Sequence, residues 1–222
     1  LGDVYKRQLD PDVADALTLV AVAAPIPYGL LAAAAPDLSV DRLLASGLAE
    51  TGVNAGESMV RPAHPLYGEI LLASLGDQAR RATHRRLVAA ARATDDQEID
   101  PLRLAIWQHE SGSLEDPEVA AAGVVAALGR HDGALAATFL RTIEDHLDAP
   151  TAALWHGSAL AQQGDHAGAD AAFARGLDPS LGTDDALVAE LASNRAFHQA
   201  FGLQDPRGAD ETLVEASARV RD

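Results

Sequence analysis

Residues 40–71 read VDRLLASGLAETGVNAGESMVRPAHPLYGEIL, and the changes of pattern along this stretch decide the fold of the first part of the chain. Residues 40–47 have helical spacing after a Ser39 cap. Residues 48–51 and 58–61 are typical of short strands, and the intervening 52–56 is good turn material. A helix over 65–75 follows, with proline at its first position. The stretch therefore predicts a helix, a two-stranded hairpin and a closing helix.

Two further helices are expected on the N-terminal side, over 11–24 and 28–35. Three helices, a hairpin and a closing helix form a winged-helix unit, which we place at residues 9–76. A long arginine-rich helix over 77–94 and the acidic tract 95–98 form a connecting segment, residues 77–99. Residues 1–8, LGDVYKRQ, resemble adapter-derived sequence and contain the single lysine of the chain, so we exclude them from the fold.

Asp-Pro steps mark helix starts along the whole chain. Aspartate can cap the free amides of a first turn, and proline fits the first helical position, where its missing N–H is not needed. His64-Pro65 is expected to act in the same way. The Asp-Pro steps begin at Asp10, Asp100, Asp116, Asp178 and Asp205.

Only helices are expected after residue 100. A pattern of aspartate, alanine four residues later and a large apolar residue four further on occurs three times, and positions four apart share one helix face. The triples are Asp132/Ala136/Leu140, Asp165/Ala169/Phe173 and Asp205/Ala209/Leu213. Another helix precedes each, over 118–128, 151–163 and 185–201. Helix pairs that repeat at the spacing of these triples indicate a tetratricopeptide-like α-solenoid over 100–222. The alternative is an irregular helical bundle.

The expected fold class is thus mainly α, a small winged-helix unit followed by a helical solenoid. The chain carries 33 acidic and 17 basic residues, a net charge of −16, and this acidity is concentrated after residue 93. Such a charge disfavours nucleic acid as a direct partner. We also expect no membrane span, because Pro25 and Pro27 break the one long uncharged stretch. A cytoplasmic location follows from these expectations.

Enzymatic motifs are absent from the sequence. The chain has no cysteine, which excludes disulfides and thiol catalysis, and no lysine outside residues 1–8, which excludes a phosphate-binding loop. It contains neither an HExxH nor a GxSxG motif, and its histidines are scattered. We therefore expect no catalytic residues, no metal site and no cofactor bound by this segment alone. Trp107 and Trp155 are expected to pack in the interior.

The helix expected over 77–94 has an arginine-rich face, which is a more distinctive feature of the sequence than the scattered histidines. It carries Arg80, Arg81, Arg85, Arg86 and Arg92 together with His84. Two interpretations remain open. The face is either solvated and meets acidic groups of the repeats, or it binds an anion or another domain.

The first part of the chain resembles the middle of LuxR-type transcriptional regulators with an ATP-binding module, which belong to the signal-transducing P-loop ATPases. The resemblance lies in the run from DALTLVAVAAPIPYGLLAAAAP through RPAHPLYGEILLASLGDQARRATHRRLVAAARA to PLRLAIWQHESG. In those proteins a nucleotide-binding domain precedes a winged helix, and tetratricopeptide-like repeats precede a helix-turn-helix. The resemblance covers about residues 14–112. It implies a regulatory fragment that lacks the nucleotide-binding core and the DNA-binding output domain.

The resemblance also implies a role for His64. In related ATPases a histidine of the winged helix contacts the nucleotide phosphates and holds the closed, ADP-bound state. His64 matches that position, with Arg61 as an assisting residue, and the alternative is a histidine that only caps its helix. ATP or ADP is then the cofactor of the parent protein.

The implied partners are the absent ATPase and helix-turn-helix domains, and a protein or small-molecule inducer on the repeats. A second interpretation of the whole chain is a stand-alone tetratricopeptide-like scaffold for protein interaction. A third is a helical enzyme whose site carries no recognised motif.

Overall fold

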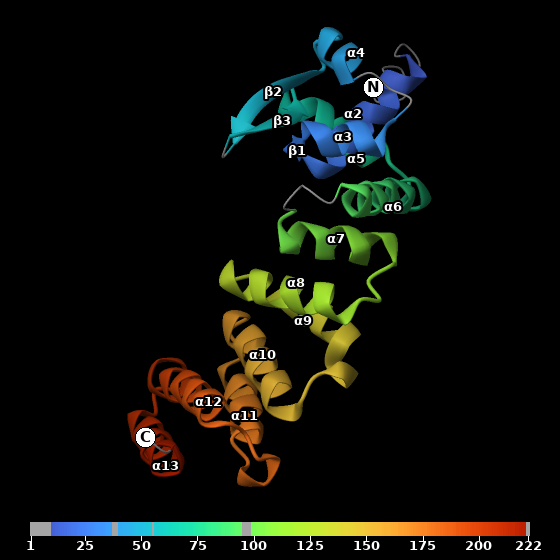
Figure 1. Cartoon of the computed structure of the whole chain (residues 1–222). Coiled ribbons are helices and arrows are strands. Elements are labelled where there is room, and N and C mark those ends of the chain that lie inside the picture. The colour runs from blue at the N-terminus through green and yellow to red at the C-terminus, as the bar shows by residue number, and fades with distance from the viewer. Residues whose placement is uncertain (1–9, 37–39, 55, 95–98, 221–222) are drawn as a thin grey trace. The chain divides into compact units, whose positions relative to one another are not determined.

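The computed structural model describes residues 10–36, 40–54, 56–94 and 99–220. Residues 1–8, the Ser39 cap and the acidic tract 95–98 lie outside the described residues. The chain divides into two compact units, Leu1–Ser113 and Leu114–Asp222. The protein is mainly helical, with one small antiparallel sheet in the first unit (Figure 1).

The helices and hairpin expected in the first unit are confirmed, with small shifts at their ends. The elements in chain order are α2 (Pro11–Ala23), β1 (Ile26–Pro27), α3 (Tyr28–Ala34), α4 (Val40–Ala45), β2 (Ala49–Asn54), β3 (Glu57–Pro62), α5 (Pro65–Ser74), α6 (Asp77–Ala93) and α7 (Pro101–Ser111).

The sheet contains a strand that the sequence did not reveal. β3 lies between β2 and the short β1, and both pairings are antiparallel. β1 places Ile26 opposite Val60, and both side chains are fully buried. A two-residue strand that contains proline carries no alternating pattern, so only its place beside β3 identifies it.

Apolar residues of α2 form the centre of the first unit. Val13, Leu17 and Val20 recur at helical spacing and are buried. They belong to the same core as Leu87 of α6 and Trp107 of α7. Burial of each such large side chain contributes roughly 1.5–3 kcal/mol. α6 and α7 are therefore part of the first unit, and the division lies after residue 113 and not at the expected 99/100.

The second unit consists of helices throughout its described residues, including the three preceding helices that the sequence predicted. They are α8 (Pro117–Gly129), α9 (Gly133–Ile143), the short 3-10 helix η1 (Glu144–His146), α10 (Ala149–Gln162), α11 (His166–Gly176), the 3-10 helix η2 (Pro179–Leu181), α12 (Asp185–Phe197), the π-helix η3 (His198–Gly202) and α13 (Pro206–Arg219). α8 packs on α9, α10 on α11, and α12 on α13.

Two of the three repeated triples pack as expected. Ala136 and Leu140 of α9, and Ala169 and Phe173 of α11, are fully buried. Gly157 of α10 lets the Phe173 ring approach so closely that a Cβ would collide with it. The expectation is wrong for the third triple. Leu213 is 43% exposed, because Thr212 occupies the buried position beside it and donates to Gln199 of η3.

The capping predictions are confirmed at every Asp-Pro step. Asp10, Asp100 and Asp116 each accept the backbone N–H two residues ahead, at 3.0 to 3.1 Å. Asp178 caps η2 in the same way, and Asp205 accepts from Gly208 at the start of α13. Aspartate and proline thus set both the position and the direction of these helices.

Candidate functional site

His64 lies between β3 and α5, at the first position before the helix. Its Nδ1 accepts the backbone N–H of Leu66 at 3.1 Å, and Pro65 begins the helix. Because Nδ1 accepts, the proton of the neutral imidazole is on Nε2. The side chain is exposed, and its ring lies 5.9 Å from that of Tyr67. His64 therefore caps α5 while its Nε2–H stays free to donate to a ligand.

Arg61, the second residue singled out by sequence, is held by a carboxylate. It stands opposite Glu50 in the β2–β3 register, and its Nε and Nη2 lie 2.8 and 2.7 Å from Glu50 Oε1. Both side chains are exposed, so the pair contributes little to stability. In the described chain no hydrogen bond or ion pair joins Arg61 to His64. Glu50 already compensates the Arg61 charge, which leaves His64 as the more accessible donor.

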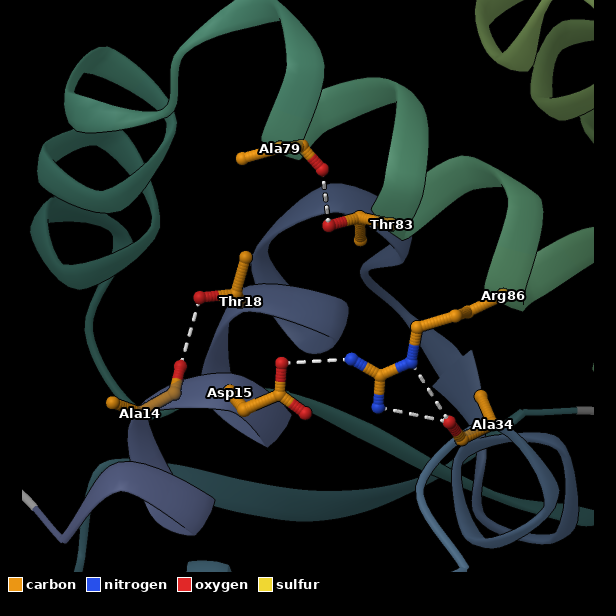
Figure 2. Close-up of polar contacts among 7 residues, drawn as sticks. All are labelled: Ala14, Asp15, Thr18, Ala34, Ala79, Thr83 and Arg86. Atoms are coloured by element: carbon orange, nitrogen blue, oxygen red, sulfur yellow. Dashed lines mark hydrogen bonds and ion pairs between the residues drawn. The ribbon is translucent and has the colours of Figure 1, made fainter.

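The arginine-rich helix α6 is anchored to the rest of the first unit through Arg86. Figure 2 shows its guanidinium between α2 and the end of α3. Nη1 donates to Asp15 Oδ1 at 2.7 Å, while Nε and Nη2 donate to the carbonyl of Ala34 at 3.3 and 3.0 Å. The last carbonyls of a helix have no partner within the helix, so Arg86 satisfies one of them. Arg86 thus meets an acidic group of the first unit, a partner that neither interpretation of the arginine-rich face had named.

His84, on the same helix, is buried and not solvated. It is 6% exposed, and its Nδ1 has no hydrogen-bond partner. Burial lowers the pKa of His84, and the charge of Arg80 lowers it further, while the Glu110 carboxylate acts in the opposite direction. Burial therefore favours the neutral form of His84. The arginine-rich helix α6 thus carries a buried histidine.

The rest of the arginine face borders a polar depression of about 420 Å³ between α6 and α7. Arg80, Arg81 and His109 line it, but so do the carboxylates of Asp77 and Glu110. Arg80 also donates to the carbonyl of Leu72 at 3.3 Å. Since the two signs of charge nearly balance, the depression shows no clear preference for an anion.

The described residues also bear on metal binding and membrane insertion. No group of three or more histidine, aspartate or glutamate side chains there is placed to hold a metal ion. No helix described here is both long and apolar enough to cross a bilayer. In the first unit, the helix α4 before the hairpin carries a single arginine, Arg42, which forms an ion pair with Asp10.

Comparison with known proteins identifies no relative of this chain. No protein-family model matches the sequence, and no curated protein or solved structure is detectably similar to it. The function is therefore argued from the residues described above.

Proposed function

We propose that the chain is a regulatory segment of an ATP-dependent LuxR-type transcriptional regulator. Its first unit is a winged helix that responds to the nucleotide, and its second unit is a tetratricopeptide-like solenoid that receives a signal. The order of three helices, hairpin and helix supports the first assignment. The successive antiparallel pairs α8/α9, α10/α11 and α12/α13 support the second.

The observation that carries the nucleotide role is the state of His64. Its Nδ1 is occupied by the capping bond to Leu66, so the ring has one orientation and one free donor, Nε2–H. A phosphate oxygen of ADP is an acceptor of the matching kind, and the N-terminus of α5 favours negative charge. The cap fixes the imidazole, and the imidazole then donates to the phosphate.

The packing of the first unit supports the transmission of such a contact. α5 packs on α2, and Arg86 joins α2 and α3 to α6. A change at the start of α5 would therefore move these helices together. In this mechanism ADP stabilises a closed form through His64, and ATP exchange shifts the population towards an open form. The nucleotide-binding core and the DNA-binding module are supplied by the longer protein.

The proposal is tested in that longer protein. The variant His64→Ala should release ADP faster and raise basal transcription, because the phosphate loses a donor. Unchanged ADP exchange and unchanged basal activity would remove the proposed contact.

A second candidate is a stand-alone tetratricopeptide-like interaction scaffold. The observation that favours it is an open groove in the second unit, about 480 Å³ in volume and lined by three of its helices. Coding context separates the two candidates. A phosphate-binding loop encoded upstream and a helix-turn-helix encoded downstream in the same frame support the regulator, whereas native start and stop codons at the ends of this segment support the scaffold.

A further inference from the structure

The groove of the second unit has one formal charge among its lining side chains. α8, α10 and α12 provide most of its walls, and the exposed Glu190 of α12 is one of its lining residues. No ion pair compensates Glu190 within the described residues. Residues 114–222 carry 18 carboxylate side chains against 7 arginines, so the surrounding field is also negative. A cationic group is the charge that this groove attracts.

The polar side chains beside Glu190 present acceptors to the groove. Ser158 donates its hydroxyl proton to the carbonyl of Leu154 at 2.8 Å. Gln162 and Asn194 each donate from the side-chain amide to a backbone carbonyl, at 2.9 Å in both cases. The hydroxyl oxygen and the two amide oxygens accept no hydrogen bond within the described residues. A ligand that supplies N–H donors matches these oxygens.

Aromatic side chains supply the remaining wall. Trp155 of α10 lines the groove and is half-buried, and Phe197 at the end of α12 is 57% exposed. The Phe197 ring also contacts those of His198 and Phe201, at centroid distances of 5.3 and 4.9 Å. Exposed aromatic faces attract cations, and a planar guanidinium stacks on them better than an ammonium does. Such exposed lining residues would leave a small molecule largely in water, since small-molecule sites bury most of their ligand. A polypeptide segment covers an open groove of this kind more completely.

We propose that the groove between α8, α10 and α12 binds an arginine-containing peptide segment of a partner protein. The arginine guanidinium pairs with Glu190, stacks on Trp155 or Phe197, and donates to Asn194. Apolar neighbours of the arginine cover the exposed aliphatic rim of α8. This inference rests on the groove that favours the scaffold candidate and names the partner of that groove. It does not depend on the nucleotide contact proposed at His64, because the second unit alone provides every residue involved.

The test uses the full 222-residue chain and a defined probe, the fluorescein-labelled peptide Gly-Leu-Arg-Phe-Leu-Arg-Gly, followed by fluorescence anisotropy. The matched probe carries citrulline in place of each arginine and keeps the shape without the charge. Glu190→Gln should weaken binding of the arginine peptide about tenfold or more, where tenfold corresponds to about 1.4 kcal/mol. Glu215→Gln, at an exposed glutamate on α13 outside the groove, removes the same charge and should change binding less than twofold. Phe197→Ala should also weaken binding.

Three outcomes would overturn the proposal. One is no saturable binding of the arginine peptide. Another is equal loss for Glu190→Gln and Glu215→Gln, which would show attraction by the general acidity alone. The third is equal affinity for the arginine and citrulline probes. Circular dichroism of each variant confirms that the helices are intact.

Discussion

Arg86 of α6 donates to Asp15 of α2 at 2.7 Å across 71 positions of sequence, and the same guanidinium holds the terminal carbonyl of α3. This contact fixes α6 to the helices that precede the hairpin. The ion pair to Asp15 and the hydrogen bonds to the Ala34 carbonyl should contribute differently to stability. The Asp15 pair is partly exposed, whereas the Ala34 residue that provides the carbonyl is buried.

Replacement of Arg86 by alanine should lower the unfolding free energy by about 1–3 kcal/mol, because it leaves a helix-end carbonyl without a donor. Asp15→Asn removes only the exposed ion pair and should cost less than about 1 kcal/mol. Urea denaturation of both variants measures the difference. Equal losses would show that the ion pair, and not the carbonyl, provides the stability of this contact.

The packing face of the second unit is tested at Ala169, which is fully buried on α11. Ala169→Glu places an unpaired charge and extra volume in the core and should cost more than about 3 kcal/mol. Ala171→Glu on the exposed side of the same helix should remain within about 0.5 kcal/mol. Thermal melting followed by circular dichroism compares the two. A similar melting temperature for both would mean that the repeated pattern does not mark the buried face.

His84 should make the first unit sensitive to acid. Its pKa is lowered in the folded protein, so the unfolded chain takes up a proton more readily below the ordinary value of about 6.5. The contribution of His84 to the unfolding free energy should therefore be constant above that pH and fall as the pH drops below it. In a Trp155→Phe background, fluorescence of the buried Trp107 reports the first unit. His84→Gln should flatten the pH dependence between pH 7 and 5, and an unaltered slope would contradict this origin.

Local patterns predicted the helices well because their signals lie within a few residues. Asp-Pro steps and helical spacing act over one or two turns of chain, and the described helices follow them. The hairpin forms as expected, but residues 52–54 of the expected turn pair with β3 as part of β2. The failures concern partners distant in sequence. No pattern connects Arg86 with Asp15, pairs Ile26 with Val60, or places Trp107 in the core of the first unit.

The candidate site was predicted only in part, for the same reason. The proline after His64 predicted only a helix start, and the nucleotide role of His64 was implied by the resemblance to LuxR-type regulators. The structure adds which nitrogen is occupied. The burial of His84 could not be read from a helix with arginines on both sides of it. Glu190 and Asn194 carried no signal at all, because their significance depends on Trp155, a residue of another helix pair that lies 35 positions from Glu190.

The central claim is that His64 contacts the phosphate of a nucleotide and does more than cap α5. The decisive measurement is the rate of ADP release from the longer protein carrying His64→Asp or His64→Ala. Aspartate keeps a good cap, as it does at the Asp-Pro steps of this chain, but it repels phosphate and has no donor. We expect His64→Asp to melt like the wild type and to release ADP at least as fast as His64→Ala. Wild-type ADP release from His64→Asp, with faster release only from the cap-deficient His64→Ala, would contradict the claim.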